Sequence, residues 1–219
     1  MSPHAPPLRG SLPPEGADPA WGGPAPDLLP HAPPPHSSPP SGDGALTLGL
    51  FHLAIKTDDL DLTRAFWCGV IGLREVVRPD FGYPGAWLAC PQPGGQAIVH
   101  VYAGGPALGG LDRVPSGSAA IDHLSLACVG YHAYRARFAA AHLAWREFLV
   151  PGTTLWQLFV YDPSGIQLEL TFEGAAETGA PPDMSEDRVY RAGRSFFHPP
   201  AYPRQVLLSL YGVNRHATL

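Results

Sequence analysis

An internal repeat constrains this fold more than any other feature of the sequence. From about residue 46 to 105, alternating and helical patterns of hydrophobicity predict the element order βαβββ, and residues 119–174 predict the same order again. Each half opens with a strand that carries a histidine, His52 in the first half and His123, 71 positions later, in the second. We therefore expect an α+β fold that consists of two βαβββ modules.

The last strand of the repeat is the clearest element. An Asp-Pro-Ser-Gly turn at 162–165 leads into an alternating run that ends at Phe172 and places Glu169 on the face opposite its apolar residues. A glutamate in mid-strand is uncommon, because a carboxylate resists burial unless it is paired or binds a metal. A solvated, outward Glu169 is the simpler alternative.

Both ends of the chain fall outside the repeat. Residues 1–45 contain 14 of the 27 prolines, so they can form neither helix nor sheet ladders. We expect a domain over 46–174, flanked by a disordered proline-rich extension and by a polar tail over 175–219, which we also expect to be disordered. A short apolar run at 206–211 could dock as a strand or helix, or be a frayed end.

Composition excludes several classes of function. The net charge is −5 and the isoelectric point is near 6, which argues against a nucleic-acid surface. No run of apolar residues is long enough for a membrane span, and the N-terminus lacks the pattern of a signal peptide. The three cysteines form no CxxC pair, which favours a reducing compartment. We expect a soluble, cytoplasmic protein.

His52, His123 and Glu169 together form a candidate set of two histidines and one carboxylate. Such a set leaves coordination positions open for a substrate or for oxygen, and it suits Fe(II), Mn(II), Zn(II), Ni(II) or Co(II). The spacing in the sequence does not by itself show that the three residues meet. Solvated or packed side chains are the alternative.

Stretches around these residues resemble the vicinal oxygen chelate superfamily, which includes glyoxalase I, extradiol ring-cleaving dioxygenases, and fosfomycin- and bleomycin-resistance proteins. The Asp-Pro-Ser-Gly turn followed by Leu-Glu is quite specific to this superfamily. The resemblance spans about residues 46–174 and rests on the stretches 51–60, 69–73, 121–126 and 161–169.

The resemblance implies that two half barrels, residues 46–105 and 119–174, cup one metal ion held by His52, His123 and Glu169. His100 occupies the position where glyoxalase I carries a glutamate ligand, and it could be a fourth ligand, an acid/base or a packed ring. Tyr161 is a second candidate catalytic residue. The implied partner is a small substrate that chelates the metal through two neighbouring oxygens, and pairing of modules between chains would give a homodimer.

Three functions follow from this resemblance. The complete triad favours a dioxygenase-like oxidoreductase with Fe(II). The second is a glyoxalase-like isomerase or lyase that uses zinc, nickel, manganese or cobalt, with His100 as a ligand or proton carrier. The third is a metal-free drug-binding protein of the bleomycin-resistance kind, which would have no need of a complete ligand set.

Overall fold

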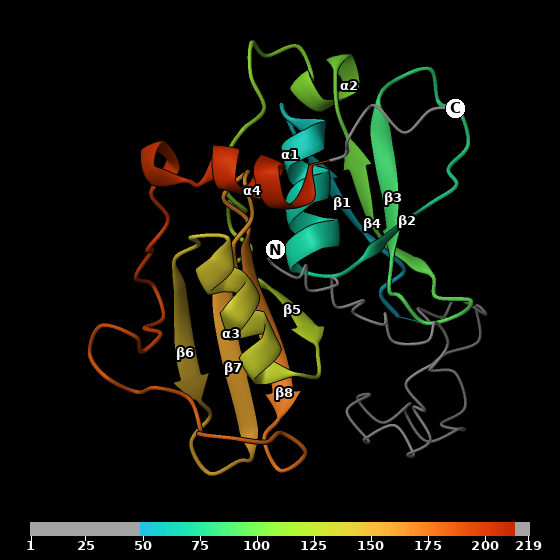
Figure 1. Cartoon of the computed structure of the whole chain (residues 1–219). Helices are drawn as coiled ribbons and strands as arrows, with labels where there is room; N and C mark the ends of the chain where they lie inside the picture. The colour runs from blue at the N-terminus through green and yellow to red at the C-terminus, as the bar shows by residue number, and fades with distance from the viewer. Residues whose placement is uncertain (1–48, 213–219) are drawn as a thin grey trace, which may run out of the picture.

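Two four-stranded sheets, one for each half of the repeat, form the framework of the described molecule (Figure 1). The computed structural model describes residues 49–212, so the expected extension over 1–45 lies outside the described residues. The first module contains β1 (Leu53–Lys56), α1 (Leu60–Arg64), the π-helix η1 (Ala65–Val70), β2 (Arg74–Val76), β3 (Gly85–Ala89) and β4 (Ala97–Tyr102).

The second module repeats this order after a connection that includes the short helix α2 (Gly105–Leu108). It contains β5 (Leu124–Ala127), α3 (Tyr131–Ala140), β6 (Trp145–Leu149), β7 (Leu155–Tyr161) and β8 (Gln167–Glu173). The sheet orders are β1-β4-β3-β2 and β5-β8-β7-β6, with β1 parallel to β4 and β5 parallel to β8. The prediction of an α+β fold with two βαβββ modules is confirmed.

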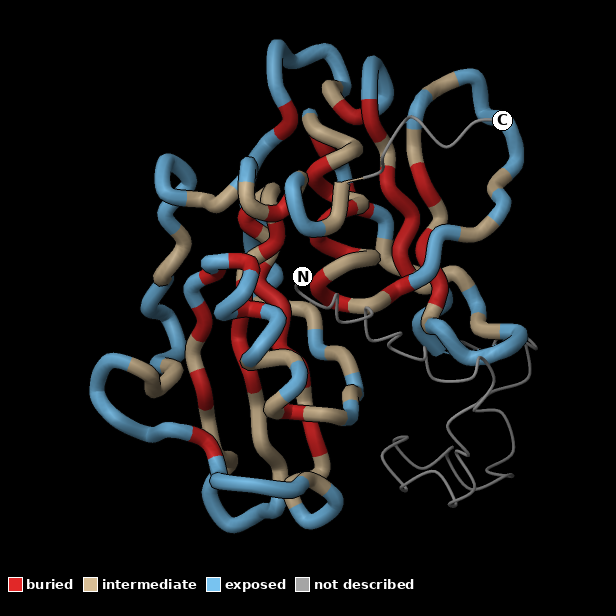
Figure 2. Tube along the Cα trace, viewed as in Figure 1, coloured by how far each residue is buried: buried red, intermediate tan, exposed pale blue. Residues whose placement is uncertain are grey.

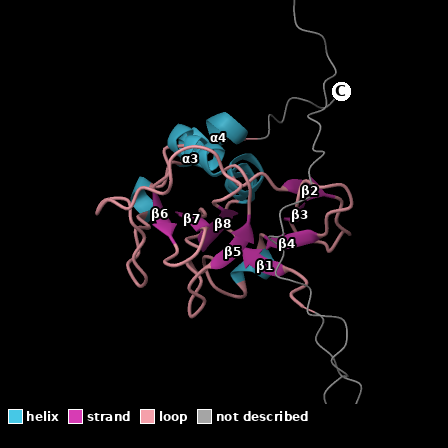
Figure 3. Ribbon diagram, turned by 90° about the horizontal axis from the view of Figure 1, so that it is seen from below, coloured by secondary structure: helices cyan, strands magenta, loops and turns pink. Residues whose placement is uncertain are grey.

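Alternation along the strands determines which side chains reach the core. Leu168, Leu170 and Phe172 of β8 are fully buried, and they belong to one apolar cluster that also includes residues of η1 and α3 (Figure 2). The helices α3 and α4 (Arg204–Tyr211) lie on the same side of the two sheets (Figure 3). Each sheet therefore has a second face, opposite these helices, which we call the outer face.

Residues 175–212 do not form the disordered tail expected from their composition. Helix α4 packs against η1, and its Leu207 is fully buried in the core. Arg204 of α4 also forms an ion pair with Asp59, 2.6 Å from guanidinium nitrogen to carboxylate oxygen. The 3-10 helix η2 (Pro199–Ala201) directly precedes α4 in the chain. The apolar run at 206–211 is thus a docked helix, because burial of its leucines offsets the entropy of ordering it.

The strands begin slightly later than the sequence predicts. His52 and His123 lie just before β1 and β5 rather than within them. The three cysteines at 68, 90 and 128 are free, as expected. Within residues 49–212, none of the helices is both long enough and apolar enough to cross a lipid bilayer.

Candidate metal centre

In the second module, His123 and Glu169 meet on the outer face of the sheet. The His123 Nε2 atom lies 3.3 Å from the Glu169 Oε2 atom. Two donor atoms that each lie about 2.1 Å from one ion, at coordination angles of 90–110°, are about 3.0–3.4 Å apart. The separation of these two atoms therefore suits neighbouring ligands of a single divalent ion.

Hydrogen bonds fix the orientation of both side chains. Asp122 Oδ1 lies 2.7 Å from His123 Nδ1, which leaves His123 Nε2 free to act as a ligand. Ser125 and Thr171 each donate a hydrogen bond from their hydroxyl to Glu169 Oε1 at 2.7 Å, so Glu169 Oε2 is the oxygen that faces His123. Outer partners of this kind are typical of metal ligands, because they set the tautomer and aim the donor atoms.

In the first module, His52 and His100 form a second pair. Their rings stack with centroids 3.9 Å apart and planes 16° apart, and Trp87 stacks on the other side of His100 at 4.4 Å. The Nδ1 atom of His52 is buried and has no hydrogen-bond partner within the described chain. A buried imidazole nitrogen without a partner is costly, and a metal ion would satisfy it.

The stacking limits what His100 can do. The ligand lone pair of an imidazole lies in the ring plane, and the two rings lie in nearly parallel, separate planes, so one ion cannot lie in both planes. Burial, together with the neighbouring His52, lowers the pKa of His100, which keeps this imidazole neutral near pH 7. In this arrangement His100 supports the ring of His52 instead of sharing a metal with it.

The two pairs do not combine within a single chain. Over residues 49–212, no three side chains of the His, Cys, Asp and Glu types are close enough to hold one metal ion. The structure brings Glu169 together with His123, and His52 together with His100, but it does not gather the predicted triad. Only the His123–Glu169 pair has two donor atoms directed toward one point, and the first module offers the single unpartnered nitrogen of His52.

Tyr161 lies on the same outer face but does not touch either pair. Its hydroxyl donates to Gln167 Oε1 at 2.6 Å, and Gln167 Nε2 in turn donates to Asp122 at 3.4 Å. Tyr161 is therefore linked to His123 only through Gln167 and Asp122. This chain of hydrogen bonds makes it a positioning residue in the present arrangement.

Four residues around the His123–Glu169 pair escaped the sequence analysis: Asp122, Ser125, Thr171 and Tyr190. Asp122 directly precedes His123, and an acidic residue beside a candidate histidine ligand is a signal that could have found it. Tyr190 gives no such signal, because it comes from the C-terminal segment. Its ring stacks on Phe159 at 3.6 Å, and its hydroxyl lies 3.3 Å from Asp122 and 3.2 Å from Gln167.

Comparison with known proteins identifies similar structures but no similar sequence. No family model matches the chain, and no curated protein matches it. A putative glyoxalase family protein from Bacillus anthracis is 16% identical, with a TM-score of 0.46 over 59% of this chain and 98% of that one. The fosfomycin resistance protein FosX from Listeria monocytogenes is 15% identical, with a TM-score of 0.45 over 58% and 94% of the two chains.

A lactoylglutathione lyase from Agrobacterium tumefaciens is 18% identical, with a TM-score of 0.43 over 64% of this chain and 100% of the other.

Proposed function

We propose that this chain is a metal-dependent enzyme of the vicinal oxygen chelate type, with the ion held by His52, His123 and Glu169. The observation that carries the proposal is the 3.3 Å approach of His123 Nε2 to Glu169 Oε2, with both side chains held by their own hydrogen bonds. A solvated surface glutamate would need none of these partners. Glu169 is instead only 8% exposed.

The third ligand, His52, comes from a second copy of the chain in this proposal. The two pairs lie in different modules and do not converge, so a two-fold dimer would complete two equivalent sites. Large apolar side chains are exposed next to the histidines: Leu50 by 83%, Phe51 by 69% and Ile121 by 61%. Exposed apolar residues around a half-site are typical of a surface that a partner covers.

A bound ion would act as a Lewis acid toward two neighbouring oxygens of a small substrate. The residues of the chain supply the rest. Asp122 holds the His123 tautomer, and Ser125 and Thr171 aim Glu169. His100, which is itself stacked on Trp87, supports the His52 ring. Because His100 is stacked rather than aimed at an ion, three protein ligands are favoured over four.

A three-ligand site favours a dioxygenase-like oxidoreductase with Fe(II), since three positions stay open for a chelating substrate and oxygen. The alternative is a glyoxalase-like lyase, in which His100 would leave its stack and serve as a ligand or proton carrier. Oxygen uptake with aromatic vicinal diols separates the two. Oxygen uptake by the iron-loaded protein supports the first, and the absence of uptake with every such diol contradicts the first and favours the second.

Metal content tests the ligand set. In protein purified without oxygen, we expect one metal ion per chain, its loss in His52→Ala and Glu169→Ala, and its retention in His100→Ala. Loss in the His100→Ala variant as well would favour the four-ligand, glyoxalase-like arrangement. A parent protein that takes up no metal even after reconstitution would contradict the proposal and favour the metal-free binding protein.

Mixing two inactive variants tests the source of His52. If each site combines His52 of one copy with Glu169 of the other, a dimer of His52→Ala with Glu169→Ala contains one intact site. Random exchange of subunits makes about half of the dimers mixed, and each mixed dimer holds one intact site of two. The mixture should therefore recover about a quarter of the parent's metal content. No recovery after exchange of subunits, measured on co-refolded chains, would show that the site does not form between copies.

A further inference from the structure

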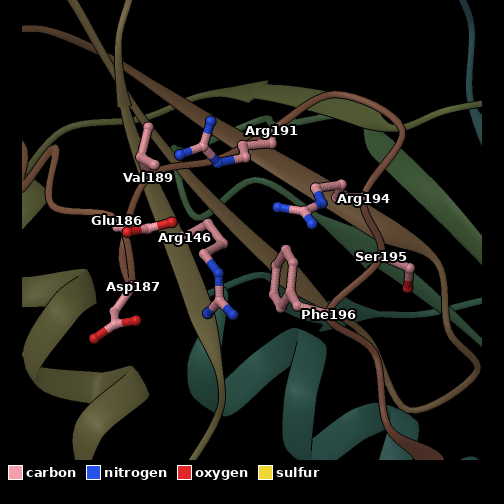
Figure 4. Close-up of a pocket in the computed structure, with 8 residues that line it drawn as sticks. All are labelled: Arg146, Glu186, Asp187, Val189, Arg191, Arg194, Ser195 and Phe196. Atoms are coloured by element: carbon pink, nitrogen blue, oxygen red, sulfur yellow. The ribbon is translucent and has the colours of Figure 1, made fainter.

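A hollow of about 360 Å³ lies between β6 and the C-terminal segment, outside the two-module fold (Figure 4). Its walls carry three arginines, two carboxylates and one aromatic ring. These six residues, which we call the arginine pocket, are Arg146, Glu186, Asp187, Arg191, Arg194 and Phe196. The volume suits a small molecule rather than a single water.

None of the three guanidinium groups of the arginine pocket lies within ion-pair distance of a carboxylate in the described chain. Among the ion pairs of residues 49–212, none involves Arg146, Arg191 or Arg194. Figure 4 shows the three groups around one open space, with Glu186 and Asp187 at its other side. The three positive charges outnumber the two carboxylates of the pocket wall, so an anion between the guanidinium groups would be stabilised.

Arg146 is already oriented for such an anion. Its Nη1 atom donates to the Trp145 carbonyl at 2.9 Å, and its guanidinium carbon lies 4.7 Å from the centre of the Phe196 ring. These two contacts hold the side chain while leaving most of its five N–H groups available. A guanidinium held in this way loses little entropy when it binds a carboxylate or phosphate.

The arginine pocket lies on the same outer face as the His123–Glu169 pair. Arg146 of β6 is paired in register with Phe159 of β7, and Phe159 with Glu169 of β8. Neighbouring strands are about 4.8 Å apart, so the backbones of Arg146 and Glu169 are separated by about 10 Å. The ring of Tyr190, stacked on Phe159, stands between them.

We propose that the arginine pocket binds the oxyanion group, phosphate or carboxylate, of a small molecule. This inference does not depend on the metal centre, because none of the three arginines contacts His52, His123 or Glu169, and Arg191 and Arg194 come from a segment that follows the repeated modules. Arg146 and the exposed pair Arg191 and Arg194 would donate charge-assisted hydrogen bonds to the oxyanion. Glu186 and Asp187 would exclude a second anion from the other side of the pocket.

Calorimetric titration of the full chain with inorganic phosphate and, separately, with succinate tests the proposal and distinguishes the two oxyanions. We expect saturable binding of at least one probe, and the tighter probe identifies the class. The double variant Arg191→Gln, Arg194→Gln should weaken binding at least about tenfold. Both arginines are exposed, so this variant leaves the core intact.

Two further variants separate a built site from general surface charge. Glu186→Gln should tighten binding about threefold, because it removes a negative charge from the pocket wall. Arg74→Gln, an exposed arginine on β2 of the other sheet, should leave affinity unchanged. Absence of saturable binding by the parent, or equal losses in Arg74→Gln and in the double variant, would overturn the proposal. Thermal unfolding of each variant checks that its fold is intact.

Discussion

At the scale of single residues, hydrogen bonds decide the chemistry of the candidate centre. Histidine and glutamate are common residues, and their identity alone does not make a ligand. Asp122 leaves the Nε2 atom of His123 free, and Ser125 holds one oxygen of Glu169 so that the other faces that nitrogen. These partners convert two ordinary side chains into a pair with the spacing of metal ligands.

Replacing Asp122 tests this positioning role. Asp122→Asn removes the negative charge next to His123 while keeping the size of the side chain. We expect a loss of about 10- to 100-fold in metal affinity with no change in fold, measured by competition with a coloured chelator. Asp112→Asn, in an exposed loop, is the matched control. Equal affinities in the two variants would show that Asp122 does not position the ligand.

The aspartate of the Asp-Pro-Ser-Gly turn makes stability depend on pH. Asp162 is fully buried and accepts hydrogen bonds from Trp67, Ser164 and Ile166. Burial nevertheless raises its pKa from 3.8 to about 6. The pKa of Asp162 is therefore higher in the folded protein than in the unfolded chain. Between these two pKa values, the folded protein binds a proton that the unfolded chain has released. Its contribution to stability is complete below about pH 4 and is lost as the pH rises through 6.

We therefore compare how much the free energy of unfolding changes from about pH 4.5 to about pH 7.5 in the parent and in Asp162→Asn. We expect the parent to lose about 2 kcal/mol more than the variant over this range. Urea unfolding of both proteins at the two pH values measures the difference. The comparison with asparagine cancels the contributions of the other titrating groups. Parallel pH profiles would mean that Asp162 stays ionised in the native state.

At the scale of elements, the C-terminal helix α4 is part of the core. It fills the space against η1, where a side chain at Gly69 would collide with the ring of Tyr211. The helix is amphipathic, with Leu207 buried and Leu210 about half exposed. Its stability therefore comes from the buried face rather than from its eight residues alone, since so short a helix is marginal in isolation.

Two leucines of this helix provide a matched comparison. Leu207→Ala should lower the free energy of unfolding by about 2–5 kcal/mol, because it leaves a cavity in a fully packed core. Leu210→Ala, which removes the same atoms from an exposed position, should cost under about 1 kcal/mol. Urea denaturation of both variants gives the two values. Similar losses would mean that α4 is not docked in solution.

At the scale of the whole molecule, the two modules form one core but leave the candidate metal ligands His52 and Glu169 apart. The helices and apolar faces of both modules share a continuous cluster, which fixes the modules against each other. His52 and His123 then lie in separate half-sites on the outer faces. In the proposed function, a second copy of the chain brings the halves together.

A charge placed beside His52 should separate the copies. We expect Phe51→Asp to raise the dimer dissociation constant at least about tenfold and to lower metal content in parallel, because Phe51 would be buried between subunits. Val77→Asp, at a residue that is 95% exposed, is the control. Sedimentation equilibrium measures the first effect and elemental analysis the second. A parent that is monomeric and fully metal-loaded would contradict the dimer.

The sequence by itself determined the modules, the strand faces and the candidate ligands. Alternation of apolar residues is a local property, so it placed Glu169 opposite the core and predicted two copies of one βαβββ order. Only the tertiary structure decided which candidates meet. Pairing of β5 with β8 brings His123 to Glu169, and pairing of β1 with β4 brings the neighbourhood of His52 to His100.

The C-terminal segment shows the same division. Its polar composition indicated disorder, yet Tyr190 stacks on Phe159 and Leu207 fills the core. The arginine pocket combines Arg146 of β6 with Arg191 and Arg194, some 45 positions later. Contacts between distant segments depend on how the whole chain packs, and local patterns of hydrophobicity and charge do not encode them.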